Sequence, residues 1–120
     1  MRFIVTNNPL VRDKCGSYRI EYVEMSSLDV LIQVRDYIHK NCWLLSHPLT
    51  GGIKLGANPY KTVLMTDGDN LDIQSLNLIE ESITVYKKFS GRVIYPQHIL
   101  DDMRELDYFL ITAAFESNKI

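Results

Sequence analysis

The sequence is poor in cysteine and has no long apolar run. Cys15 and Cys42 are the only cysteines among 120 residues. Neither belongs to a CxxC pair or lies near clustered histidines, as a zinc site or a thioredoxin-like motif would require. No segment approaches the roughly 20 apolar residues of a membrane span, and the first residues lack the apolar core of a signal peptide. We therefore expect a cytoplasmic protein with two reduced thiols that does not contact a membrane.

The common motifs for phosphate and metal binding are also missing. There is no GxGxxG, and the Lys61-Thr62 pair has Leu55 and Tyr60 where a P-loop requires glycines. The chain has three histidines, His39, His47 and His98. They are isolated from one another and lack the helical spacing of paired metal ligands. The sequence thus predicts neither a metal site nor a bound cofactor.

Charge of one sign does not dominate. The net charge is −2, with 13 Lys and Arg against 15 Asp and Glu, which argues against a general nucleic-acid-binding protein. Residues 1–61 carry eight basic and five acidic side chains, whereas residues 62–120 carry five basic and ten acidic ones. This asymmetry either arises by chance or favours an anionic ligand on the basic half.

Apolar runs that alternate with amphipathic stretches predict strands and helices in turn. The predicted strands are Arg2–Thr6, Tyr18–Val23 (an edge strand), Trp43–Ser46 and Thr62–Thr66. The predicted helices are Leu10–Lys14, a helix capped by Ser26 or Ser27 that ends at Lys40, a helix capped by Asp72 that ends near Phe89, and one that begins at Pro96. A short extended piece is predicted before the last helix, at Arg92–Tyr95. This order predicts a single α/β domain over residues 1–120, a sandwich with a mostly parallel four-stranded sheet covered by helices. The expected strand order is 2-1-3-4.

Each long helix has an apolar stripe that we expect to face the sheet. The predicted stripes are Leu28, Leu31, Val34 and Ile38, then Leu76, Ile79, Ile83 and Tyr86, and finally Ile99, Met103, Leu106 and Leu110. The segment Tyr108–Phe115 is apolar on nearly every side. It is therefore either buried under the core or in contact with a second subunit.

A long polar segment between the third and fourth strands is the candidate site. The segment His47–Lys61 has three glycines, two prolines and no periodicity, and loops of this length in small domains are usually functional or disordered. The first and third strands end alike, in Thr6-Asn7-Asn8-Pro9 and Ser46-His47-Pro48. If these strands are neighbours, their polar ends share one rim, where ligands of open parallel sheets bind. The candidate ligand-binding residues are Thr6, Asn7, Asn8, Ser46, His47, Thr50, Gly51, Gly52, Lys54, Asn58, Tyr60 and Lys61.

The same residues also have structural interpretations. Asn, Ser and His before proline are ordinary turn residues, and His47 is either a hydrogen-bonded structural residue or a general acid or base. Tyr60 either packs its ring or uses its hydroxyl. Lys54 and Lys61 are either solvated charges or ligands for a phosphate or carboxylate, with the backbone amides of Gly51 and Gly52 forming an anion-binding nest.

Four stretches of the sequence together resemble the GrdX family. They are Ile4–Val11 (IVTNNPLV), Leu28–Asp36 (LDVLIQVRD), His47–Gly51 (HPLTG) and Asn58–Val63 (NPYKTV). Members are small proteins encoded in the glycine reductase gene clusters of anaerobic, amino-acid-fermenting bacteria. The resemblance implies a cytoplasmic, reducing setting and a link to glycine reductase, a selenoprotein and thiol system that yields acetyl phosphate. It carries over no catalytic residue.

Three functions follow as hypotheses. The first is a non-catalytic accessory protein of the glycine reductase system that binds a small anionic metabolite or a reductase component at the His47–Lys61 loop. The second is a small enzyme that uses His47 as acid or base beside Ser46 and Tyr60. The third is a homo-oligomeric or other interaction module that uses the Tyr108–Phe115 segment.

Overall fold

The computed structural model describes residues 1–49, 58–88 and 94–118. Its strands are β1 (Arg2–Thr6), β2 (Arg19–Tyr22), β3 (Cys42–Leu44) and β4 (Thr62–Asp67). Its helices are α1 (Pro9–Lys14), α2 (Ser27–His39), α3 (Ile73–Lys88) and α4 (Gln97–Ser117). The predicted elements are confirmed with bounds that differ by at most two residues. The extended piece expected at Arg92–Tyr95 lies partly outside the described residues.

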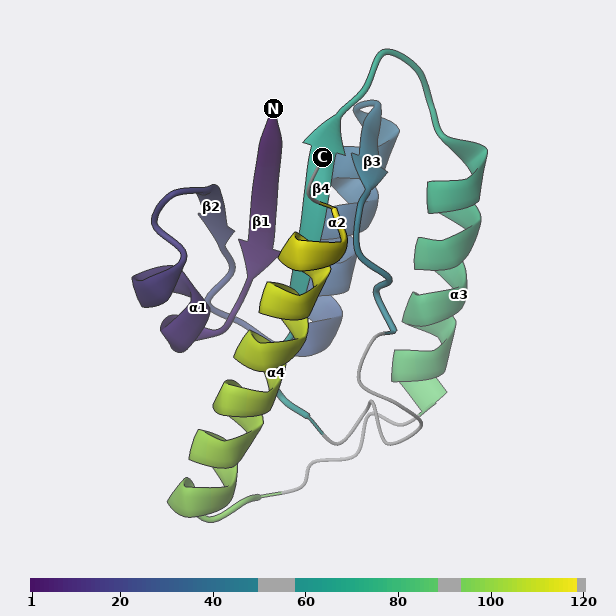
Figure 1. Ribbon diagram of the computed structural model, residues 1–120. Helices are drawn as coiled ribbons and strands as arrows, with labels where there is room; N and C mark the ends of the chain where they lie inside the picture. Colours follow the sequence, from purple (N-terminus) through teal and green to yellow (C-terminus); the bar gives the residue numbers. More distant parts are fainter. Residues whose placement is uncertain (50–57, 89–93, 119–120) are drawn as a thin grey trace.

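The four strands form one mixed sheet in the order β2-β1-β4-β3. β1 pairs with β2 in parallel, whereas β4 pairs antiparallel with both β1 and β3 (Figure 1). The α/β class, the four strands and the edge position of β2 are confirmed. The mostly parallel sheet and the order 2-1-3-4 are wrong, because β4 lies between β1 and β3 and runs antiparallel to both. β4, rather than β3, is therefore the neighbour of β1.

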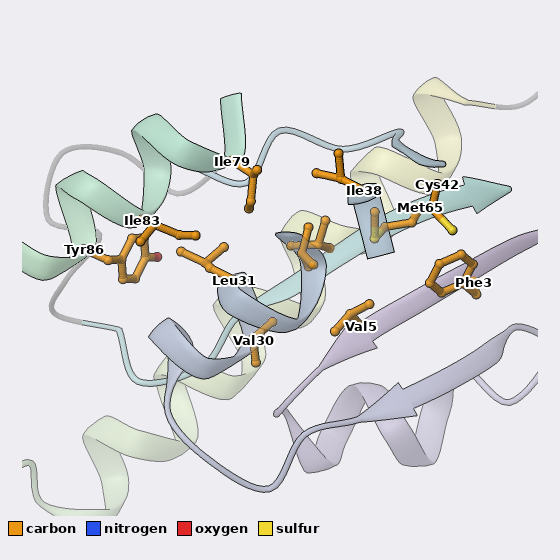
Figure 2. Close-up of a cluster of buried hydrophobic side chains, with 12 residues drawn as sticks. Phe3, Val5, Val30, Leu31, Ile38, Cys42, Met65, Ile79, Ile83 and Tyr86 are labelled. Atoms are coloured by element: carbon orange, nitrogen blue, oxygen red, sulfur yellow. The ribbon is translucent and has the colours of Figure 1, made fainter. Parts of the chain in front are cut away.

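The side chains of the central strands alternate between two apolar clusters. Phe3, Val5, Val63 and Met65 join buried residues of α2 and α3 in the larger cluster. Figure 2 shows Ile79, Ile83 and Tyr86 of α3 pointing toward Leu31 of α2. Ile4 and Leu64 face the other way and join Val11 of α1 and Ile111 of α4. In Figure 1, α4 accordingly crosses the sheet on the side opposite to α2.

Local signals set the limits of the helices. Ser26 caps α2, and its hydroxyl and the carboxylate of Asp29 exchange hydrogen bonds with each other's backbone N–H groups, as in a capping box. Asn41 ends the helical segment with φ at 70°, a left-handed conformation that asparagine tolerates better than most residues. Asn8 caps α1 by accepting a hydrogen bond from the N–H of Leu10, and Pro9 takes the first helical position.

The buried face of α4 differs from the predicted stripe. Asp107 and Ile111 are 6% and 3% exposed, whereas Leu106 is 49% exposed. The predicted stripe through Leu106 was therefore wrong by about one residue, or ~100° around the helix axis. A carboxylate occupies the centre of the inward face, so a stripe drawn through apolar residues alone is displaced.

The segment Tyr108–Phe115 is divided between the core and the surface. Ile111 is buried, and Tyr108, Ala114 and Phe115 pack against the smaller cluster, where Phe115 stacks on Tyr18 with ring centroids 4.5 Å apart. Phe109 points outward and is 67% exposed. In the part of the chain that the structure describes, no helix combines the length and apolarity needed to cross a bilayer.

Candidate functional site

Two polar strand ends and the start of a third strand meet at one edge of the sheet. β1 and β3 both run antiparallel to β4, so their carboxyl ends point toward the edge where β4 begins. Thr6 of β1 pairs with Thr62, and Leu44 of β3 pairs with Met65, three residues further along β4. The prediction that β1 and β3 are neighbours is wrong, since β4 separates them by about 10 Å, two strand spacings. Their ends nevertheless share an edge, with Lys61 and Thr62 between them.

A directional chain of hydrogen bonds connects this edge to α4. The hydroxyl of Thr62 lies 2.6 Å from Oδ2 of Asp107 and 2.7 Å from the hydroxyl of Thr6. A carboxylate can only accept, so Thr62 donates to Asp107 and in turn accepts from Thr6. The oxygen of Thr6 also accepts from the backbone N–H of Asn8. All these groups are buried, so the chain holds α4 in a defined position on the sheet.

Asn8 joins three elements through one side chain. Its Oδ1 caps α1, and its Nδ2 donates to Oδ2 of Asp107 and to the carbonyl oxygen of Arg104, both at 3.0 Å. Asn8 is fully buried. Its amide group therefore has partners within the protein on both ends and acts as a structural junction.

Asn7 has a similar role on the other face. Its Nδ2 donates to the carbonyl oxygens of Met25 and Pro59 at 2.9 and 2.8 Å. Its Oδ1 accepts from the backbone N–H of Lys61 at 2.8 Å. Asn7 thus fixes the segment that enters β4. The bonds made by Thr6 and Asn7 position Lys61 and Thr62, and the role of Thr6, Asn7 and Asn8 in ligand binding stays a prediction.

Lys61 is a buried cation at this edge. Its side chain is 4% exposed, and its Nζ lies 5.5 Å from the centre of the Tyr86 ring, a distance typical of a cation–π contact. Burial lowers the pKa of Lys61 to about 8, against the opposing effect of the Asp107 carboxylate. Burial also raises the pKa of Asp107, against hydrogen bonds from Thr62 and Asn8 and the charge of Lys61.

Tyr86 completes the buried group. Burial raises the pKa of its hydroxyl well above the ordinary value, and the negative charge of Asp107 adds to this effect. Tyr86 therefore stays neutral at physiological pH. The edge contains one cation, one carboxylate and one neutral phenol in a poorly solvated environment, where charges interact more strongly than in water.

Ser46 and His47 follow β3 on the far side of this group. The hydroxyl of Ser46 accepts from the N–H of Leu64 at 2.9 Å, which continues the pairing of β3 with β4. Nδ1 of His47 accepts from the N–H of Leu49 at 3.0 Å. His47 is exposed. The structural role considered for His47 is therefore present, and its role as acid or base stays a prediction.

Asn58 and Tyr60 connect the end of the loop to α4. Nδ2 of Asn58 donates to the carbonyl oxygen of Met103, and its Oδ1 accepts from the N–H of Tyr60. The hydroxyl of Tyr60 accepts from Nε of Arg104 at 2.8 Å, and the guanidinium group lies 5.1 Å from the centre of its ring. Tyr60 therefore uses both its ring and its hydroxyl to hold Arg104.

A small pocket opens between the sheet edge and α4. It has a volume of about 20 Å³, enough for roughly one water molecule or a single oxygen of an anion. Its lining combines polar residues of the edge with apolar residues of α4: Ser46, His47, Lys61, Thr62, Asp107, Leu110, Ile111 and Ala114. Three predicted site residues, Ser46, His47 and Lys61, thus lie around one opening.

The remaining predicted residues of the loop, Thr50, Gly51, Gly52 and Lys54, lie outside the described residues. Sequence analysis missed Thr62, Tyr86 and Asp107, all of which belong to the buried polar group. A signal for Asp107 was present, since Met103, Leu110, Ile111 and Ala114 surround it on a helical wheel. Among residues 1–49, 58–88 and 94–118, no three His, Cys, Asp or Glu side chains are grouped so that they could hold a metal ion.

Comparisons with known proteins identify the family. No curated protein and no solved structure gives a significant match to this chain. A family model described as GrdX-like protein matches residues 3–116, which include every element from β1 to nearly the end of α4. The resemblance expected from the four sequence stretches is therefore confirmed, and the chain belongs to the GrdX-like protein family.

Proposed function

We propose that this protein is a non-catalytic accessory protein of the glycine reductase system and binds a small anionic metabolite at the sheet edge. Family membership supports the link to that system. The observation that carries the binding proposal is the position of Lys61, a cation that lines a pocket also bordered by Ser46 and His47. One oxygen of a carboxylate or phosphate fits the pocket.

In this proposal the anion is attracted by Lys61, which supplies positive charge below its pKa of about 8. The Asp107 carboxylate lines the same opening and is hydrogen-bonded to Thr62 and Asn8. The sequence predicts further contacts to the anion from Thr50, Gly51, Gly52 and Lys54, which lie outside the described residues. Thr6, Asn7 and Asn8 serve as positioning residues behind the opening.

Isothermal titration calorimetry at pH 7 tests the proposal with phosphate, acetyl phosphate and glycine. We expect saturable heat with at least one of them, and an affinity lower by about tenfold or more in Lys61→Met, which corresponds to about 1.4 kcal/mol of lost binding energy. Lys88→Met is the matched control, because Lys88 is exposed at the end of α3 and should not alter affinity.

The same proposal predicts a pH dependence of binding. Since Lys61 loses its proton above a pKa of about 8, anion affinity should fall as the pH rises from 7 to 9. An absence of heat with all three ligands, or equal losses in Lys61→Met and Lys88→Met, would contradict the metabolite site. Circular dichroism spectra of both variants must match the wild type, so that a loss of affinity is not a loss of folding.

A further inference from the structure

The outward face of α4 carries an exposed apolar strip. Leu106 is 49% exposed and Phe109 is 67% exposed, and Ala113 is exposed one turn further along. Their spacing of i, i+3 and i+7 places them in one line on a helix. This line lies on the opposite side of α4 from Asp107 and Ile111, which face the sheet.

Carboxylates border this strip. Asp102 and Glu105 are exposed; Asp102 lies four residues before Leu106 and Glu105 lies four residues before Phe109, on the same outward side. Across its whole length α4 has five acidic residues, Asp101, Asp102, Glu105, Asp107 and Glu116, and one arginine. That arginine, Arg104, is engaged by Tyr60 and by Asp101, whose carboxylate is 3.6 Å from the guanidinium group.

The nearest basic group of α1 is also engaged. Nζ of Lys14 lies 5.1 Å from the centre of the Tyr108 ring, on the flank of α4 that packs beside α1. The outward face itself thus combines an aromatic ring, a leucine and two carboxylates. Apolar anchors at i, i+3 and i+7 are the pattern by which a helix engages a partner segment.

We propose that this face of α4 docks a basic, amphipathic helical segment of a partner protein. The apolar side of that segment covers Leu106 and Phe109, and its lysines or arginines lie against Asp102 and Glu105. The carboxylates of Asp102 and Glu105 favour a basic partner through charge complementarity. A second copy of α4 would bring the same carboxylates against each other, and an anionic lipid surface would repel them. The surface is separate from the pocket at Lys61, so the two proposals fail independently.

A model peptide tests this surface directly. The probe is an amphipathic helix of about five turns, with leucines on one side and lysines on the other, and binding to the full-length protein is followed by fluorescence anisotropy. We expect Phe109→Ser to weaken binding about tenfold, as expected for an exposed aromatic anchor. The double variant Asp102→Asn, Glu105→Gln should weaken binding and reduce its salt dependence between about 0.05 and 0.5 M.

Control variants on α3 separate this site from non-specific attraction. Ile73 is 59% exposed, and Glu81 is also exposed on α3. Ile73→Ser and Glu81→Gln should leave affinity unchanged, and hydrogen exchange should show peptide-dependent protection limited to α4. The proposal would be overturned if the peptide did not bind, or if the α3 variants lost as much affinity as the α4 variants. It would also be overturned if light scattering showed a dimer that Phe109→Ser dissociates. Co-flotation with vesicles of anionic lipid would also overturn it, in favour of a membrane surface.

Discussion

At the scale of single residues, Asp107 is the group on which the position of α4 depends. It is buried, and one of its oxygens accepts hydrogen bonds from Thr62 at 2.6 Å and from Asn8 at 3.0 Å. Both donors bond the same oxygen, so an asparagine in its place can still accept from them, but only through a neutral amide oxygen. Both buried hydrogen bonds then become weaker, and Lys61 loses a nearby opposite charge.

We therefore expect Asp107→Asn to lower the free energy of unfolding by about 1–3 kcal/mol, because hydrogen bonds to a charged acceptor contribute more than those to a neutral one. Urea denaturation followed by circular dichroism measures it. Asp102→Asn on the exposed side of the same helix is the control and should change stability by less than about 0.5 kcal/mol. Similar values for the two variants would show that the bonds of Asp107 contribute little.

Lys61 predicts a dependence of stability on pH. Its pKa is about 8 in the folded protein, against 10.5 for an ordinary lysine. Between these values the unfolded chain binds a proton that the folded protein has lost, so the contribution of Lys61 to stability increases as the pH rises. The change approaches about 1.4 kcal/mol per pH unit within this window.

The variant Lys61→Met removes this titration and keeps much of the side-chain volume. At pH 7 we expect the variant to be at least as stable as the wild type, because it no longer buries a charge. The stability of the wild type should then increase relative to that of the variant between pH 8 and 9.5, below the range in which Tyr86 titrates. Unfolding at several pH values measures this difference, and a difference that stays constant with pH would mean that Lys61 is not desolvated.

At the scale of elements, the helices show how far local patterns determine structure. The capping box of α2 and the cap of α1 by Asn8 involve residues only a few positions apart, and these helix starts agreed with the sequence prediction. Which face of α4 is buried depends on the hydrogen bonds from Asn8 and Thr62 to Asp107, and these residues are 99 and 45 positions away from it. The apolar neighbours of Asp107 on the helical wheel indicate that it is buried, but no pattern within the helix identifies its distant partners.

The orientation of α4 can be tested with a pair of variants. Ile111 is 3% exposed and Leu106 is 49% exposed, so Ile111→Ala should cost about 2–5 kcal/mol through loss of contacts and a cavity. Leu106→Ala should cost less than about 1 kcal/mol. Urea denaturation measures both losses of stability. A larger loss in Leu106→Ala than in Ile111→Ala would mean that the stripe predicted from the sequence faces the sheet.

At the scale of the whole molecule, the sheet order decides which strands are most protected. β1 and β4 are central, whereas β2 and β3 form the edges. Amides of Phe3–Val5 and Val63–Met65 should therefore exchange more slowly with solvent than those of β2 and β3. Hydrogen exchange followed by NMR measures this directly. If the amides of β3 were as protected as those of β1, and those of β4 were not, the predicted order 2-1-3-4 would be correct instead.

The same strand order explains why the candidate site differs from the rim predicted from the sequence. The expected rim depended on β1 and β3 being neighbours, and the antiparallel insertion of β4 placed Lys61 and Thr62 between their ends. Three predicted residues, Ser46, His47 and Lys61, still line one pocket. Ser46 and His47 follow β3, so they lie at this edge in either topology. Lys61 precedes β4 and reaches the same edge only because β4 runs antiparallel to its neighbours.

The sequence by itself determined the family, the α/β class and the positions of the strands and helices, because caps, apolar periodicity and turn residues act over short distances along the chain. The tertiary structure alone decided the direction of β4, the rotation of α4 and the burial of Lys61 beside Tyr86 and Asp107. These features depend on contacts between residues more than 20 positions apart, for which the local pattern of residues carries no signal.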